Sequence, residues 1–146
     1  MLKLSDYLRP ETVFELGQVA RTDALTEVVE YVLAGLHPRQ KSQAREQLRM
    51  SGAGTEVDIG EHVVLSHVRL EGIDGLLVGA GYRPAEAHLG TLFVFVAVPE
   101  VAAREYLRLL ARLARWATEV RVQPASGVSG VHDLLAAVRS FDENWA

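Results

Sequence analysis

His67 and Arg69 are the two residues in this sequence whose types and spacing could do chemistry. They end the stretch "VVLSHVR", residues 63–69, and side chains two apart on a strand share a face, while Ser66 between them points away. A neutral imidazole keeps a lone pair that can attack phosphorus, accept a proton or bind a metal. A guanidinium is always charged and donates hydrogen bonds to anionic oxygens. The pair therefore predicts a phosphoryl-transfer site, in which positioning and charge stabilisation are the main needs.

On this pattern alone, a purely structural histidine at the end of a strand is the commoner explanation. Two other groupings could also carry chemistry. His62 and His67, with Glu61 and His88, would form a metal site and make the chain a metal-dependent hydrolase, but their spacing matches no familiar ligand motif. The Gly-rich segments "SGAGTE" and "GLLVGAGY" lack the remaining residues of a P-loop and of a dinucleotide-binding turn.

The bulk properties of the chain restrict the class of protein. Its 146 residues suit one domain, residues 1–146, with one core. The net charge of −4 provides no positive field to attract nucleic acid or anionic lipid. The absence of cysteine excludes disulfides and fits a reducing compartment. The most apolar run, residues 91–99, is too short to cross a bilayer. We therefore expect a cytoplasmic protein with no nucleic-acid partner and no direct membrane insertion.

The elements that must position His67 follow from apolar periodicity. Strands are expected at residues 12–16, 62–69, 75–80, 91–98 and 119–123, and helices at about 22–35, 42–50, 101–117 and 129–140, after a short helical turn from Ser5. Thr22 and Asp23 offer an N-cap for the first long helix. This alternation favours an α/β fold, a single-domain three-layer sandwich in which a mixed β-sheet is flanked by helices on both faces.

The helix at residues 101–117 has two notable faces. An apolar stripe is expected to face the core and comprises Leu107, Leu110, Leu113, Ala114 and Ala117. A row of arginines follows the same helical spacing and comprises Arg104, Arg108, Arg112 and Arg115. This row is either a solvated face paired with Glu105 and Glu119, which we favour, or a docking surface for an acidic partner.

The residues around His67 also follow a distinctive order. Ile59-Gly60 is followed by a short gap, three strand-forming residues and then His67-Val68-Arg69. This order resembles the active-site segment of the fructose/mannitol-type enzyme IIA domains of the bacterial sugar phosphotransferase system, which their nitrogen-related relatives share. That segment reads roughly I-G-x-G, three mostly apolar residues, P-H-x-R. Two later segments, "LFVFVAVPE" and "EYLRLLARLAR", are similar to the family's buried strand and the following helix, so the resemblance covers nearly the whole chain.

The resemblance implies a phosphoryl-carrier or regulatory domain. His67 would accept a phosphoryl group from the histidine phosphocarrier protein. It would then pass the group to a transporter's IIB domain or use it as a signal to a regulated transporter or kinase. Arg69 and Arg49 would steady the phosphoryl oxygens, and Tyr106 and Ser66 would donate hydrogen bonds near the histidine. No metal or organic cofactor would be needed.

Three positions depart from the family pattern. His62 replaces the second glycine, Ser66 replaces the proline before the histidine, and Tyr106 occupies a position where the family often has a second active-site histidine. Proline fixes φ and glycine allows close backbone approach, so these changes alter the loop that would hold a phosphate. The alternative is therefore a degenerate enzyme IIA-like module that regulates a partner protein by binding, without being phosphorylated.

Overall fold

The sheet has five strands in the order β1-β4-β5-β3-β2. The computed structural model describes residues 2–17, 20–51, 56–84, 90–122 and 130–144. Its strands are β1 (Val13–Glu15), β2 (Glu56–Ile59), β3 (Val63–Arg69), β4 (Leu77–Arg83) and β5 (Thr91–Val98). The pairs β1–β4 and β3–β5 are parallel, whereas β2–β3 and β4–β5 are antiparallel. The sheet is therefore mixed, as predicted.

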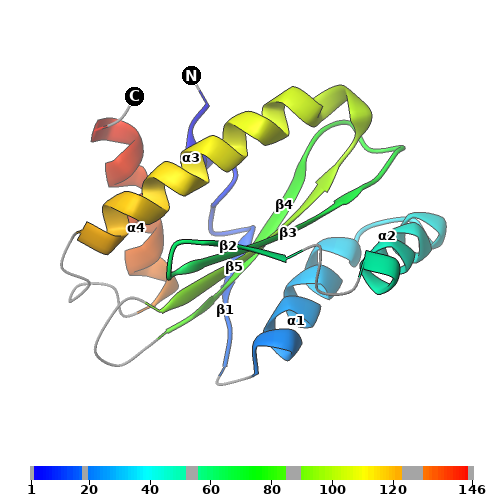
Figure 1. Ribbon diagram of the computed structural model, residues 1–146, viewed down its shortest axis with the longest axis horizontal. Coiled ribbons are helices and arrows are strands. Elements are labelled where there is room, and N and C mark those ends of the chain that lie inside the picture. Colours follow the sequence, from blue (N-terminus) through cyan, green and yellow to red (C-terminus); the bar gives the residue numbers. More distant parts are fainter. Residues whose placement is uncertain (1, 18–19, 52–55, 85–89, 123–129, 145–146) are drawn as a thin grey trace.

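Helices cover both faces of this sheet (Figure 1). They are α1 (Arg21–Leu33), α2 (Pro38–Ser51), α3 (Ala103–Val122) and α4 (Val131–Asn144), with short 3-10 helices η1 (Leu4–Asp6) and η3 (Glu100–Ala102). Val63 and Leu65 of β3 share one core cluster with α3, α4 and η1. Val64 and Val68 share the other with α1 and α2. The predicted three-layer α/β sandwich is confirmed, and β3 alternates between its two cores.

Two glycines of β4 allow α1 to lie close against the sheet. A Cβ added at Gly79 would lie 2.3 Å from Val32 of α1, and one added at Gly81 would lie 2.8 Å from both Leu16 and Val28. Packed interiors do not tolerate contacts this short without displacement. The G-x-G of "GLLVGAGY" therefore serves the packing of α1 on the sheet.

Asp142 of α4 joins the beginning of the chain to its last helix. Its buried carboxylate accepts hydrogen bonds from the backbone N–H groups of Leu4 (3.0 Å) and Ser5 (2.8 Å) and from the guanidinium of Arg112 (3.3 Å). Burial opposes ionisation of Asp142, but these hydrogen bonds outweigh it and hold its pKa below the ordinary value. Arg112 thus faces α4, and it is not part of a solvated row of arginines.

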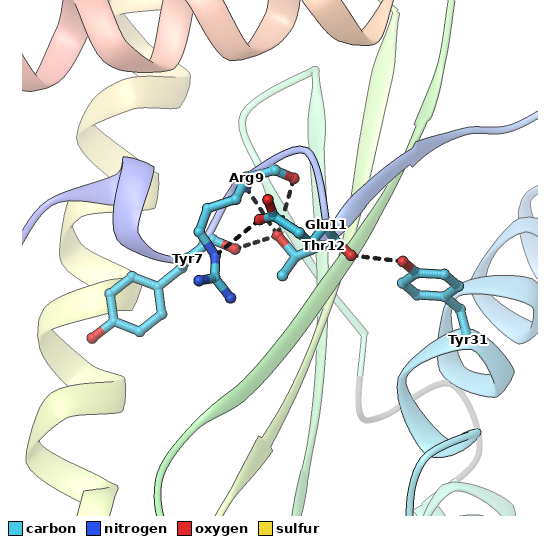
Figure 2. A network of polar contacts seen from close by, with 5 residues as sticks. All are labelled: Tyr7, Arg9, Glu11, Thr12 and Tyr31. Carbon is cyan, nitrogen blue, oxygen red and sulfur yellow. Dashed lines mark hydrogen bonds and ion pairs between the residues drawn. The ribbon is translucent and has the colours of Figure 1, made fainter.

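A polar network secures the segment between η1 and β1 (Figure 2). The hydroxyl of Thr12 accepts a hydrogen bond from the Arg9 N–H (2.9 Å) and donates to the carbonyl oxygen of Tyr7 (2.5 Å). The hydroxyl of Tyr31 on α1 donates to the carbonyl oxygen of Glu11 (2.6 Å). These contacts tie the turn at residues 9–12, which leads into β1, to α1.

The expected strand at residues 119–123 is wrong over the described part, because residues 119–122 form the last turn of α3; residue 123 lies outside the described residues. No glycine or proline interrupts residues 103–122. The helix therefore continues, because each added residue gains one hydrogen bond for the backbone entropy that it loses. The apolar stripe predicted for this helix is confirmed at Leu113 and Ala117 and wrong at Leu107 and Ala114. Leu109 and Trp116 are buried together with Leu113 and Ala117, whereas Leu107 is 61% exposed.

The first two helices begin at other residues than expected. Ala20 is the N-cap of α1 and makes no side-chain capping bond, so Thr22 lies inside the helix, with Asp23 in its first turn. The second helix begins at Pro38 instead of residue 42. Proline is well suited to a first helical position, because the N–H that it lacks has no partner there.

Candidate functional site

His67 lies near the carboxyl end of β3, opposite Val96 of the parallel strand β5. The carboxyl ends of neighbouring parallel strands form the edge of an α/β sheet at which ligands commonly bind. The His67 side chain is half-buried on the face covered by α3. Its ring centroid lies 5.1 Å from that of Tyr106, in the first turns of α3, with 35° between the ring planes. The structure thus brings together two of the predicted site residues.

The surroundings of the two rings favour their neutral forms. Burial lowers the pKa of His67 below its ordinary value of 6.5, and burial raises the pKa of Tyr106 above 10.0. Near neutral pH the imidazole is therefore uncharged and the phenol remains protonated. Nδ1 of His67 is buried and has no hydrogen-bond partner in the described part of the chain. The chemistry of the ring is consequently left to Nε2.

Arg69, the third predicted residue, is exposed at the last position of β3. Its backbone is held by a side chain that sequence reasoning missed. The Arg69 N–H donates to Oε1 of Gln47 on α2 (2.9 Å), and Nε2 of Gln47 donates back to the Arg69 carbonyl oxygen. Within the described residues, pairing of β2 with β3 extends only to Ser66, and Gln47 hydrogen-bonds the edge of β3 beyond that point. A glutamine on a polar helix carries no signal in the sequence that could have revealed this role.

The segment after β3 is connected to the start of α3. Nε2 of Gln40 on α2 donates to the carbonyl oxygens of Glu71 (3.2 Å) and Gly72 (3.1 Å). The carboxylate of Glu71 accepts a hydrogen bond from the backbone N–H of Glu100 at the start of η3 (3.0 Å). The loop that follows the His67 strand is therefore linked to the helix that carries Tyr106.

The two remaining predicted residues do not lie beside the His67 ring. Ser66 is buried, and strand alternation turns its side chain toward the α1–α2 layer, away from His67. Arg49 is exposed on α2 and forms an ion pair with Glu46 at 2.6 Å. In these positions neither side chain points toward a phosphoryl group on His67. Their contacts with such a group therefore stay predictions.

A metal site formed by His62 and His67 does not fit the structure. His62 precedes β3 and its Nδ1 lies 3.2 Å from the Gly90 carbonyl oxygen, while His67 is five residues further along. At about 3.3 Å per residue, these positions are roughly 16 Å apart. Within the described residues no group of three or more His, Cys, Asp or Glu could hold a metal ion. His88 lies outside that part of the chain.

The described helices also include none that is both long and apolar enough to span a membrane. Most of the Gly-rich segment at residues 51–56 lies outside the described residues, so the structure does not test its interpretation as a loop.

Comparison with known proteins identifies a shared fold. No protein-family model and no curated protein matches the chain. The crystal structure of the nitrogen regulatory protein IIA-Ntr from Neisseria meningitidis is similar, with a TM-score of 0.65 and 16% sequence identity. The similarity covers 92% of this chain and 98% of that one. At this low identity, the structural similarity establishes the fold alone. The shared fold agrees with the resemblance seen in the sequence.

Proposed function

We propose that this chain is an enzyme IIA-like regulatory or phosphoryl-carrier domain of the phosphoenolpyruvate-dependent phosphotransferase system, with His67 as the phosphoryl acceptor. The observation that carries the proposal is the contact between the half-buried imidazole of His67 and the ring of Tyr106 at the carboxyl end of β3. The fold shared with a nitrogen regulatory protein supports a regulatory role. The proposed partners are the histidine phosphocarrier protein and either a IIB domain or a regulated transporter or kinase.

The transfer step needs no proton movement. Nε2 of His67 attacks the phosphorus of the donor's phosphohistidine, which requires the neutral ring to carry its proton on Nδ1, the buried nitrogen without a hydrogen-bond partner within the described residues. The N–P bond of the donor breaks, and its imidazole leaves with the bonding electron pair. The new N–P bond places positive charge on the ring of His67, next to the dianionic phosphoryl group. A lowered pKa serves this step, because a protonated Nε2 could not attack.

Neighbouring residues would stabilise the transferred group. Arg69 belongs to the same strand face as His67 and would supply cationic donors, and the protonated hydroxyl of Tyr106 would supply one more. Arg49 would first have to exchange its ion pair with Glu46 for the phosphoryl oxygens. The Ser66 hydroxyl would have to reach the phosphoryl group from the opposite face.

Phosphorylation by the phosphocarrier system tests this proposal. Wild-type protein incubated with phosphoenolpyruvate and that system should take up acid-labile phosphate, and His67→Ala should take up none. His62→Ala is the matched control, because His62 is at the other end of β3, and it should be labelled like the wild type. Absence of label on the wild type, under conditions that label an authentic enzyme IIA domain, would overturn the carrier role.

A second function, regulation by binding alone, is favoured by a different observation. Two of the predicted phosphate ligands are engaged elsewhere, since Ser66 faces the other core and Arg49 is paired with Glu46. In this case the domain would dock on a partner in an unmodified state. A partner that binds wild type and His67→Ala with equal affinity, in a background where the wild type is never labelled, would establish this function instead.

A further inference from the structure

The outward side of α3 carries two arginines that lack ion-pair partners within the described residues. Arg104 and Arg108 are exposed, one helical turn apart. Val101, just before the helix, is 85% exposed, and Leu107 is 61% exposed. We call these four residues the α3 outer face. Tyr106, whose ring contacts His67, belongs to the same helix but lies on its opposite, sheet-facing side.

Of the nearest carboxylates, Glu105 is engaged elsewhere, and the exposed Glu100 forms no ion pair with Arg104 within the described residues. Glu105 accepts a hydrogen bond from the Tyr7 hydroxyl, on the side of α3 that faces η1. From Tyr106 to Thr118 the helix has no Asp or Glu at all. The whole chain has a net charge of −4, so this positive surface is a local feature. Arg104, Arg108 and Arg115 are exposed, as expected for a solvated face, but the expected pairing with Glu105 is not present in the described part of the chain.

We infer that the α3 outer face docks an acidic protein surface that also presents apolar side chains. Arginine is enriched in protein interfaces, and carboxylates are the charges that complement it. This inference goes beyond the proposed function, because docking needs no phosphoryl transfer.

Two other classes of partner fit this face less well. An amphipathic helix binds a lipid surface by burying its apolar side in the membrane, but the apolar side of α3 is already in the core through Leu109, Leu113 and Trp116. Single-stranded nucleic acid needs aromatic stacking platforms along a cationic surface, and the α3 outer face has none.

The experiment is an NMR titration of the ¹⁵N-labelled full chain with an acidic amphipathic peptide of about 20 residues built from Glu and Leu. Amide shifts should concentrate at residues 101–111, and the affinity should fall at least tenfold between 50 and 300 mM NaCl. Arg104→Glu with Arg108→Glu should weaken binding at least tenfold. Arg39→Glu with Arg139→Glu, an equal charge change at exposed positions elsewhere, should leave the affinity within twofold.

Three outcomes would overturn the inference. They are equal loss of affinity in both double variants, shifts centred away from α3, and binding of anionic vesicles (phosphatidylglycerol with phosphatidylcholine) without binding of the peptide. Chemical phosphorylation with phosphoramidate separates this test from the proposed function, because that small donor needs no docking. Arg104→Glu with Arg108→Glu should be labelled on His67 like the wild type, so failure of docking and failure of His67 as an acceptor give different results.

Discussion

The imidazole of His67, near the carboxyl end of β3, and the phenol of Tyr106, at the start of α3, lie 5.1 Å apart between ring centroids. Burial lowers the pKa of the imidazole and raises the pKa of the phenol, so both groups are favoured in their neutral forms. His67 on the strand and Tyr106 on the helix are 39 positions apart in the sequence, and the fold brings their rings together in one partly buried site.

Removing the phenol should therefore change the titration of the imidazole. In Tyr106→Ala, water reaches His67, and its pKa should rise toward the ordinary value of 6.5. Tyr106→Phe keeps the ring and should leave the pKa of His67 nearly as in the wild type. Titration of the His67 ring by NMR measures both. An unchanged pKa in Tyr106→Ala would mean that other neighbours provide the burial.

The same shift predicts how His67 affects stability at different pH values. Its folded-state pKa is lowered, so the unfolded chain binds more protons as the pH falls through 6.5. The contribution of the neutral ring is therefore present above 6.5 and is lost as the pH falls through the folded-state pKa. Urea unfolding at pH 7.5 and 5.5 should show a smaller loss of stability for His67→Gln than for the wild type; an equal loss would contradict this assignment.

Gln47 should stabilise the end of β3. Gln47→Ala removes two hydrogen bonds to the Arg69 backbone and should cost about 1–2 kcal/mol of unfolding free energy. Hydrogen exchange at the Arg69 amide should accelerate more than exchange in the middle of β3. Gln43→Ala, an exposed glutamine of the same helix, is the control and should change stability by less than about 0.5 kcal/mol. Equal exchange rates in the two variants would exclude this role for Gln47.

Gly81 should not accept a larger residue. A Cβ there would meet Leu16 and Val28 at 2.8 Å, so Gly81→Ala should destabilise the protein by about 1–3 kcal/mol. At Gly75 no atom lies within 4 Å of an added Cβ, and Gly75→Ala should be close to neutral. Thermal unfolding of the two variants compares them directly, and a neutral Gly81→Ala would show that α1 moves away without cost.

Asp142 should account for part of the acid sensitivity of the fold. Its pKa is held below the unfolded value of 3.8, so its contribution is present above 3.8 and is lost as the pH falls through the folded-state pKa. Asp142→Ala leaves Arg112 and two backbone N–H groups without their acceptor and should cost about 3–5 kcal/mol at pH 7. Asp58→Ala breaks an exposed ion pair with Arg21 and should cost at most about 1 kcal/mol. Similar losses in urea unfolding would contradict the special role of Asp142.

Several features of this protein were determined by the sequence itself. The two-residue period of a strand places His67 and Ser66 on opposite faces whatever surrounds them, and the apolar stretches of β3 and β5 were predicted as strands on that basis. Alternating helices and strands predicted the three-layer architecture. The His67–Arg69 spacing and the order of segments that resembles enzyme IIA domains directed attention to the carboxyl end of β3. All of these depend on local periodicity or on residue order.

Other features were decided only by the tertiary structure. Apolar residues make up more than half of α3, so the sequence could not show whether Leu107 or Leu109 faces the core. The packing of Leu109 and Trp116 against the sheet decided it. The last turn of α3 alternates like a strand, yet the helix continued because nothing interrupted it. Gln47 and Arg69, and likewise Tyr106 and His67, meet only because the chain folds them together. Contacts between distant segments depend on which surfaces pack, and no period within one segment records that choice.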